Sequence, residues 1–272
     1  MPLLEVCRAV SRLGYQGFEI APYTLAEDPA ALSAGHRSEV RKSMSDEGLE
    51  FAGLHWLLAA PAGLQVATND GALRASSWNY VRQLIDLCAD LATPGARWHP
   101  VVVFGSPKQR SSVAGSSPAE ALQYFTDGLA RVAPHAESRH VTLLIEALSP
   151  SQTDVITSLA EAVSIVRQIA SPAVETMFDV HNAVAETEPH GTLLERYFQH
   201  IRHVHVNEMD GREPGMGDYD FLNLLRKLSE MNYAGWVSLE AFDFSRDPRD
   251  VAARAIETLK AARSAGAPLQ TL

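Results

Sequence analysis

The amino-acid sequence predicts an α/β fold: a (β/α)8-type TIM barrel that lacks its first strand. Short apolar segments alternate with longer segments of helical periodicity along the 272 residues, and this alternation is typical of repeated βα units. Successive strands are far enough apart for a helix to connect them, as parallel strands require. No strand is followed by a dinucleotide-binding glycine fingerprint or a Walker loop, so a doubly wound sheet is the second choice. We expect residues 1–272 to form one domain, because barrels of roughly 250 residues fold as single units.

Seven segments are predicted to be strands, because they are short, apolar and mostly bounded by Gly, Pro or Asn. They are Gly17–Tyr23, Phe51–Leu58, Pro100–Gly105, Val141–Leu148, Val174–Asn182, Arg202–Glu208 and Trp236–Phe242. The amphipathic segments that follow them are predicted to be helices. These are Ala30–Glu47, Ala72–Leu91, Pro118–Glu137, Ser158–Ile169, Leu193–His200, Phe221–Met231 and Pro248–Ser264. Two long loops, Ser106–Pro118 and Asp210–Asp220, also follow strands, which places them at the catalytic face of a barrel.

The N-terminal residues are predicted to be helical instead of extended. Leu3, Cys7, Val10 and Leu13 recur at helical spacing, and Gly14 is a natural C-cap. No room is left for a strand before this helix, so we count eight helices and seven strands. We therefore expect a gap between the first and last strands, covered by a loop or a partner chain, since unpaired edges are costly when buried. The alternative is that the natural chain starts upstream of Met1 and carries the missing strand.

Composition and charge exclude several classes of protein. Acidic residues outnumber basic ones 33 to 23, which gives a net charge of −10 and argues against a nucleic-acid-binding protein. The sequence contains neither a signal peptide nor an apolar run long enough to span a membrane. Cys7 and Cys88 are too few for a disulfide framework and have no metal-ligand spacing. We expect a cytoplasmic protein whose partner is a small molecule, with a homo-oligomer left open.

Four predicted strands in succession each place one polar side chain near the end of an apolar run. These residues are Glu146, Asp179, His205 and Glu240, each separated from the next by about one βα unit. A single acidic residue at a strand end is more often a helix cap than a functional group. Four at equivalent positions are expected to meet at the C-terminal face of the barrel.

These four groups predict a site for one divalent metal ion. Three carboxylates close together repel one another unless a cation neutralises them. One imidazole among oxygen ligands suits an open site for Mn²⁺, our first expectation, with Mg²⁺, Co²⁺ or Zn²⁺ as alternatives. His203 shares a strand face with His205, but only the residue nearer the strand end should reach the metal. We therefore assign His205 as the ligand and interpret His203 as a residue of the barrel interior.

The chain resembles the xylose-isomerase-like barrel superfamily, which includes sugar isomerases and epimerases, inosose-processing enzymes and the endonuclease IV group. The resemblance begins at Gly14–Glu19 and runs to the last helix, and the similarity is greatest to ketose 3-epimerases of the tagatose/psicose type. Its strongest stretches are Ile145–Asp154, Met177–Ala183, His203–Gly217 and Gly235–Phe242. It implies that Glu146, Asp179, His205 and Glu240 bind one metal ion and that the two glutamates also act as the acid/base pair.

The chemistry implied by this resemblance is a proton transfer next to the carbonyl of an unphosphorylated ketose or related polyol. The metal would stabilise an enediolate, and two glutamates on opposite faces would invert the carbon. A single glutamate that moved the proton between adjacent carbons would give an aldose–ketose isomerisation instead. The sequence leaves this choice open.

The candidate substrate-binding residues match the resemblance less well. Gln152 stands where the epimerases usually carry a glutamate, and Asn182 stands where they carry a substrate-contacting histidine, with His181 beside it. Arg212 lies next to the position of their substrate arginine, which is a glycine here. His55 resembles a residue that lines the sugar pocket, although a lone histidine is at least as often structural.

Three other functions are weighed against this one. An inosose dehydratase or isomerase would use the same four ligands, so only an activity panel separates it from an epimerase. A DNA-repair enzyme of the endonuclease IV type needs three metals, further histidines and a more basic surface. A non-enzymatic sugar-binding barrel would not need two complete acid/base carboxylates.

Overall fold

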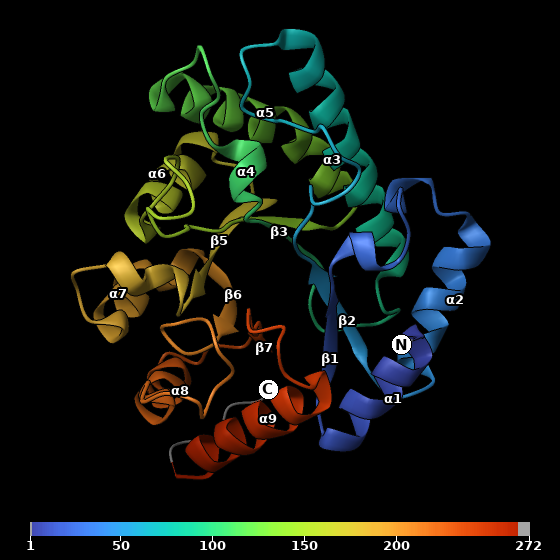
Figure 1. Cartoon of the computed structure of the whole chain (residues 1–272), viewed down its shortest axis with the longest axis vertical. Coiled ribbons are helices and arrows are strands. Elements are labelled where there is room, and N and C mark those ends of the chain that lie inside the picture. The colour runs from blue at the N-terminus through green and yellow to red at the C-terminus, as the bar shows by residue number, and fades with distance from the viewer. Residues whose placement is uncertain (1, 266–272) are drawn as a thin grey trace.

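The computed structural model describes residues 2–265, which form a barrel of seven parallel strands surrounded by helices (Figure 1). The strands are hydrogen-bonded in chain order from β1 to β7, as expected when each βα unit is added beside the previous one. Their bounds are β1 Gly17–Ile20, β2 Glu50–Leu54, β3 Val101–Phe104, β4 Thr142–Ile145, β5 Val174–Asp179, β6 Ile201–Val206 and β7 Trp236–Leu239. The predicted TIM barrel with seven strands is confirmed.

The helices form the outer layer, and most lie within one or two residues of the predicted ranges. Helix Ala34–Ser45 starts four residues later than predicted, and helix His190–Tyr197 lies three residues earlier than predicted. Gly14 ends the first helix in the left-handed conformation, with φ of 94°, and Ser117 forms a capping box with Glu120 at the start of another. The helices are α1 Leu3–Leu13, α2 Ala34–Ser45, α3 Gly71–Leu91, α4 Pro107–Arg110, α5 Pro118–Ser138, α6 Leu159–Ile169, α7 His190–Tyr197, α8 Phe221–Glu230 and α9 Pro248–Ala265. The single turn α4 lies in the loop Ser106–Pro118 and was not predicted, because one helical turn leaves no periodic pattern.

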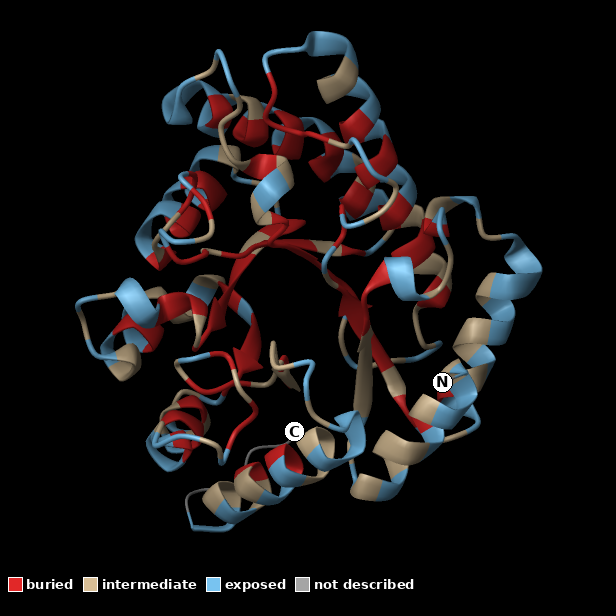
Figure 2. Ribbon diagram, in the orientation of Figure 1, coloured by how far each residue is buried: buried red, intermediate tan, exposed pale blue. Residues whose placement is uncertain are grey.

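Most strands end earlier than the apolar pattern predicts. Leu58 and Leu148 lie beyond the ends of β2 and β4, yet both are at most 3% exposed. Their side chains stay in the core although their backbone no longer forms strand hydrogen bonds. The apolar sequence pattern therefore extends past each strand into the loop that follows it. The loops after the strands are therefore anchored at the C-terminal end of the barrel, where Figure 2 shows buried residues beyond the strands.

The alternation of side chains along the strands decides which residues face the inside of the barrel. Val103, Leu144 and Met177 form a small apolar cluster with Val101, separate from the layer between strands and helices. Because successive side chains of a strand point to opposite faces, residues two positions further along share this orientation. Glu146 and Asp179 follow Leu144 and Met177 in this way. Their carboxylates consequently lie above a packed apolar floor.

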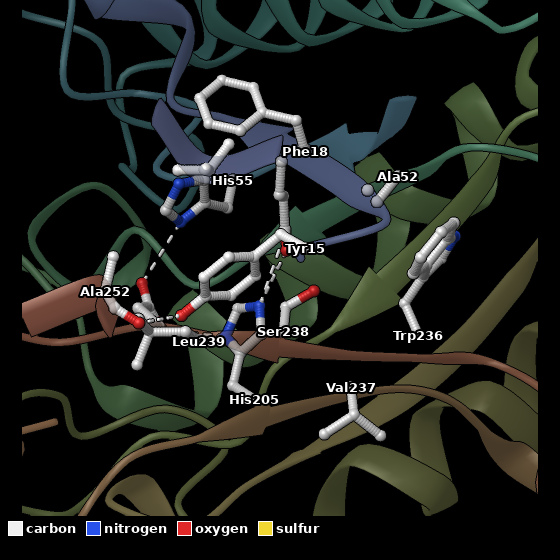
Figure 3. A pocket seen from close by; sticks show the side chains of 14 residues that line it. Tyr15, Phe18, Ala52, His55, His205, Trp236, Val237, Ser238, Leu239 and Ala252 are labelled. Atoms are coloured by element: carbon white, nitrogen blue, oxygen red, sulfur yellow. Dashed lines mark hydrogen bonds and ion pairs between the residues drawn. The ribbon is translucent and has the colours of Figure 1, made fainter. Parts of the chain in front are cut away.

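The barrel is open between β1 and β7, as the strand count predicted. Within residues 2–265, β1 pairs with β2 and β7 pairs with β6, and no ladder joins β1 to β7. A cavity of about 190 Å³ lies at this gap (Figure 3). At one end the indole of Trp236 packs on Gly17, where an added Cβ would lie 2.8 Å from the ring. Glycine at position 17 is therefore needed for this contact.

Two helices cover the outside of the gap, instead of the loop or partner chain that we expected. Helices α1 and α9 pack against each other (Figure 1). The Lys260 ammonium of α9 donates to the carbonyl of Leu13 at 2.8 Å, and the Tyr15 hydroxyl donates to the carbonyl of Ala252 at 2.8 Å. The expectation failed because the amphipathic first helix has its own partner in the last one. No helix of the described chain is both long and apolar enough to cross a bilayer.

Candidate metal centre and active site

The four predicted ligands converge at the C-terminal end of the strands. Glu146, Asp179, His205 and Glu240 each offer one atom, and these atoms all lie within 4.8 Å of one another. All four residues are buried, with exposed fractions between 1% and 8%. They come from four successive strands, two within the strands and two just after them, so the parallel arrangement brings distant sequence positions to one place.

The His205 imidazole lies at the centre of the three carboxylates. Its Nδ1 is 2.8 Å from Glu240 Oε2, 3.5 Å from Asp179 Oδ2 and 3.9 Å from Glu146 Oε1. Despite the short distance to Glu240, the orientation does not form a hydrogen bond, and both Nδ1 and Glu240 Oε2 are buried without a hydrogen-bond partner among the described residues. Unpartnered buried polar atoms are costly, so this pair requires an explanation.

Glu146 is held by a chain of amides and by a close backbone approach. The Asn182 amide donates to Glu146 Oε1 at 3.0 Å, and the Gln152 amide donates to Asn182 Oδ1 at 2.6 Å. On the other side Gly105 leaves the space that Glu146 occupies, because a Cβ there would lie 2.2 Å from Oε2. The guanidinium of Arg110 donates to the backbone carbonyl of Glu146 at 2.6 Å. Position 146 is thus fixed from three directions.

Glu240 has different partners, all of which are aromatic. The Trp56 indole N–H donates to Glu240 Oε1 at 2.8 Å, and His55 Nδ1 lies 3.2 Å from the same oxygen. Trp56 adopts a left-handed backbone with φ of 52°, a conformation that costs energy in a non-glycine residue and often marks a functional site. Its ring stacks on Phe242 with 6.3 Å between the centroids.

The two glutamates differ in their electrostatic surroundings. Burial, followed by the charges of Glu240 and Asp179, raises the pKa of Glu146 well above its usual value. Burial also acts to raise the pKa of Glu240, but His205 and His55 outweigh it and hold that pKa well below the usual range. The pKa of His205 is well above its usual value, because Glu19 and Glu240 outweigh the effect of burial. Without a further cation, a proton on His205 or Glu146 must balance the excess negative charge.

The residues present fit a divalent cation. Ligand bonds of about 2.0–2.6 Å place the ligands of a single ion up to about 4–5 Å apart, which matches the 4.8 Å limit of this cluster. A cation between His205 Nδ1 and Glu240 Oε2 would satisfy both unpartnered atoms. Three carboxylates and one imidazole form a donor set suited to Mn²⁺, Mg²⁺ or Co²⁺.

A cavity of about 430 Å³ opens directly beside this cluster. Glu146 and Glu240 line it from different strands, and Gln152, Asn182 and Trp56 also line it. Its volume lies in the range of about 300–1,000 Å³ that is typical of small-molecule sites. Of its lining side chains in the described chain, only Lys108 is cationic. The arrangement can hold a small polar molecule between two carboxylates.

The other predicted substrate residues do not all reach this cavity. His55 contacts Glu240 from the gap side of the barrel. His181 Nδ1 lies 2.8 Å from the carbonyl oxygen of Met209, and its ring packs against Phe242. Arg212 is paired with Asp210, with 2.7 Å between Nε and Oδ2, and is 36% exposed. Neither His181 nor Arg212 lines the cavity between the glutamates.

Sequence analysis missed four residues that support the centre. Glu19 binds His203 and His205, Asn207 donates to Asp179 Oδ2 at 3.3 Å, and Trp56 and Arg110 hold the two glutamates. A signal existed only for Glu19, the one charged residue in the short strand Gly17–Ile20. Trp56 carries no such signal, because its hydrogen bond to Glu240 depends on an unusual backbone conformation. His203 is fully buried inside the barrel, as predicted.

Comparisons with known proteins find relatives that align with most of the chain. Fructoselysine 3-epimerase from Shigella flexneri is 21% identical over 96% of this chain and 93% of its own length. D-psicose 3-epimerase from Agrobacterium fabrum is 23% identical over 86% of this chain and 77% of its own length. Both alignments span most of the barrel.

Solved structures share the fold. A D-psicose 3-epimerase crystallised in the presence of D-fructose superposes with a TM-score of 0.81 and 19% identity, over 97% of this chain and 93% of that one. A 3-keto-D-glucoside 4-epimerase from E. coli superposes with a TM-score of 0.80 and 19% identity, over 95% of this chain and 94% of that one. The family model described as "Xylose isomerase-like TIM barrel" matches residues 7–262. This chain therefore belongs to the xylose isomerase-like TIM barrel family.

Proposed function

We propose that this protein is a divalent-metal-dependent sugar epimerase that acts on an unphosphorylated ketose. The observation that carries the proposal is the position of Glu146 and Glu240, which line one cavity from two different strands and belong to one cluster with Asp179 and His205. Several relatives of the chain are named 3-epimerases of fructoselysine, D-psicose or L-ribulose, and this supports the same class of reaction here.

The centre would be held by Glu146, Asp179, His205 and Glu240, and we expect Mn²⁺. A bound cation of this kind would polarise the substrate carbonyl and neutralise charge that develops on its oxygen. The four groups are at most 8% exposed, and burial strengthens electrostatic interactions inside the site.

The chain's own residues supply the proton transfers. One glutamate removes the proton from the carbon next to the carbonyl, and the other returns a proton to the opposite face, which inverts that carbon. Asn182 donates to Glu146 Oε1 and Trp56 donates to Glu240 Oε1, and these hydrogen bonds orient the two carboxylates. Gln152 orients Asn182 and has an amide suited to a sugar hydroxyl.

The cavity favours a substrate without a phosphate group. Lys108 is the only cationic side chain among its described lining residues, and two glutamates lie at its base. Arg212, the other candidate cation, is already paired with Asp210. We also propose a cytoplasmic location, which the two buried, unpaired thiols of Cys7 and Cys88 support.

The test is proton exchange with solvent. The Mn²⁺-loaded protein is incubated in D₂O with D-fructose, D-psicose, D-tagatose or L-ribulose, and the products are analysed by NMR after removal of the metal. Deuterium at C3 together with the C3 epimer supports the proposal. Deuterium at C1 with an aldose product indicates the isomerase alternative, and absence of exchange with every ketose overturns a proton-transfer role on these sugars.

A further inference from the structure

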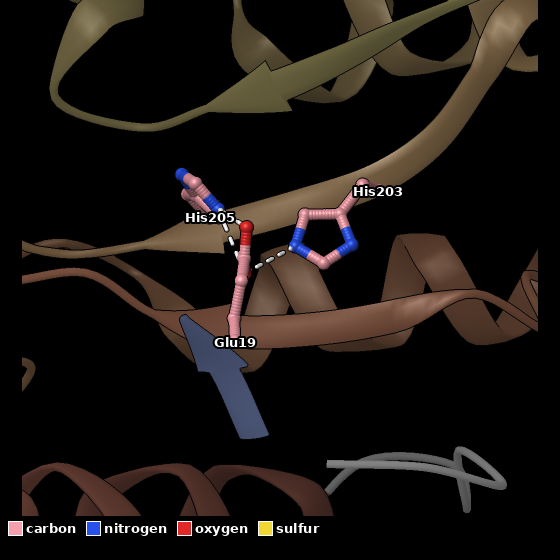
Figure 4. A group of neighbouring side chains, drawn as sticks. All are labelled: Glu19, His203 and His205. Carbon is pink, nitrogen blue, oxygen red and sulfur yellow. Dashed lines mark hydrogen bonds and ion pairs between the residues drawn. The ribbon is translucent and has the colours of Figure 1, made fainter. Parts of the chain in front are cut away.

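A second buried cluster lies directly beneath the candidate metal centre. Glu19 of β1 reaches across the barrel interior to two histidines of β6 (Figure 4). Its Oε2 lies 2.9 Å from His203 Nε2 and 3.2 Å from His205 Nε2. The Glu19 side chain is 8% exposed, and the two histidines are at most 1% exposed. The register between β1 and β2 shifts between Phe18 and Glu19, an irregularity that re-aims side chains.

These contacts fix the protons of both imidazoles. Glu19 Oε2 lies within hydrogen-bond distance of both Nε2 atoms, and a carboxylate oxygen accepts hydrogen bonds, so each Nε2 carries a hydrogen and donates it. Nδ1 of His205 is then the nitrogen that faces Glu240, Asp179 and Glu146.

A cation bound between Glu19, His203 and His205 is the competing interpretation, because their ligand atoms also lie within 4.8 Å of one another. Such an ion would need the lone pair of His205 Nε2, while the upper centre needs the lone pair of Nδ1. A neutral imidazole has one such lone pair. Hydrogen bonding by Glu19 occupies Nε2 of both histidines and leaves Nδ1 of His205 for the upper centre, without this conflict.

We propose that Glu19 is a positioning residue of the metal centre, which holds His205 so that Nδ1, and not Nε2, faces the cation. The inference rests on the proposed function, because it assumes a metal at the upper cluster. Glu19 itself lies on the far side of the His205 ring from the three carboxylates. It therefore acts through the histidine, as carboxylates behind metal-binding histidines commonly do.

The first test measures Mn²⁺ affinity by EPR detection of the free ion. Glu19→Leu removes the acceptor, and Glu19→Gln keeps one acceptor oxygen of similar size. We expect binding to weaken about 10–100-fold in Glu19→Leu and by less in Glu19→Gln. The matched control is Glu175→Gln, which alters a glutamate–histidine contact of 3.0 Å at the other end of the barrel and should leave Mn²⁺ affinity within about twofold. Wild-type affinity in Glu19→Leu, or an equal loss in the control, overturns the proposal.

The second test needs no variant and therefore does not depend on whether Glu19→Leu folds. Wild-type protein labelled with ¹⁵N-histidine is loaded with diamagnetic Zn²⁺, and His205→Asn identifies the resonances. The proposal predicts one slowly exchanging proton on Nε2 of His205 and none on Nδ1. A proton on Nδ1 with metal at Nε2 overturns it. Failure of the wild type to bind either Mn²⁺ or Zn²⁺ instead overturns the proposed metal-dependent function.

Discussion

The two ends of the barrel use glutamate and histidine in opposite ways. At the N-terminal end, Glu175 lies 3.0 Å from His200 and 2.7 Å from Arg202, so a complete positive partner balances its charge. At the C-terminal end, three carboxylates surround the single imidazole of His205, and two atoms lack hydrogen-bond partners among the described residues. His200 and Arg202 balance the charge of the lower group, whereas the upper group has an excess of carboxylates that the proposed cation would neutralise. Both groups contain glutamate and histidine, so the residue types do not distinguish them. The excess of negative charge is what distinguishes the candidate binding site from the structural ion pair.

The largest expected effect is a loss of kcat, and it should occur only when a glutamate at the C-terminal end of the barrel is replaced. Glu146→Gln and Glu240→Gln should each lower kcat by about 10²–10⁴-fold or more, because an amide cannot exchange the proton. Glu175→Gln should leave kcat within about twofold, and circular dichroism should report an intact fold for all three variants. Turnover at the wild-type rate in either upper variant would contradict the acid/base assignment.

The second prediction tests the space around Glu146. A Cβ at Gly105 would lie 2.2 Å from Glu146 Oε2, whereas a Cβ at Gly71 meets nothing closer than 3.9 Å. Gly105→Ala should therefore displace the carboxylate and lower kcat/KM by about 10²-fold, since small misplacements at a reacting centre have effects of this size. Gly71→Ala should retain kcat/KM. Equal activity of the two variants would show that the position of Glu146 is not critical.

The third prediction concerns removal of the metal. At a Mn²⁺ concentration 100 times its Kd, binding to the folded state adds about 2.7 kcal/mol to the free energy of unfolding. For a chain of this size that increment raises Tm by about 5–10 °C, and EDTA should reverse it. In Asp179→Asn the increment should shrink, because a neutral amide is a weaker ligand. If Mn²⁺ does not change the Tm of the wild type, the proposal that Mn²⁺ binds at the C-terminal cluster is contradicted.

The smallest expected effect is on the free energy of unfolding, at the N-terminal end of the barrel. Glu175→Gln should reduce the free energy of unfolding by about 0.2–1 kcal/mol, because Arg202 is 45% exposed and solvent screens the pair. Urea denaturation with and without Mn²⁺ measures this, and the loss should be the same in both. A larger loss in the presence of metal would show that the two ends are coupled.

Much of the architecture could be predicted because it follows from local patterns. The alternation of strands and helices and the C-cap at Gly14 depend on periodicity and glycine conformation, which are visible in a short window. The same patterns predicted seven strands, as the described residues show. The convergence of Glu146, Asp179, His205 and Glu240 was also predictable, since successive parallel strands end at one face. The strand ends were placed too late, because Leu58 and Leu148 remain buried beyond them.

The sequence by itself determined the barrel and the four groups at its mouth, because strand order follows chain order and each group sits at the same place in its βα unit. Only the tertiary structure decided which neighbours these groups have. Three contacts join segments that no local sequence pattern relates. They are the hydrogen bond from Trp56 to Glu240, the close approach of Gly105 to Glu146 and the contact between Glu19 and His205. Such contacts form only when side chains from opposite parts of the barrel are positioned to within a few tenths of an ångström. Side-chain packing in the folded structure sets these positions.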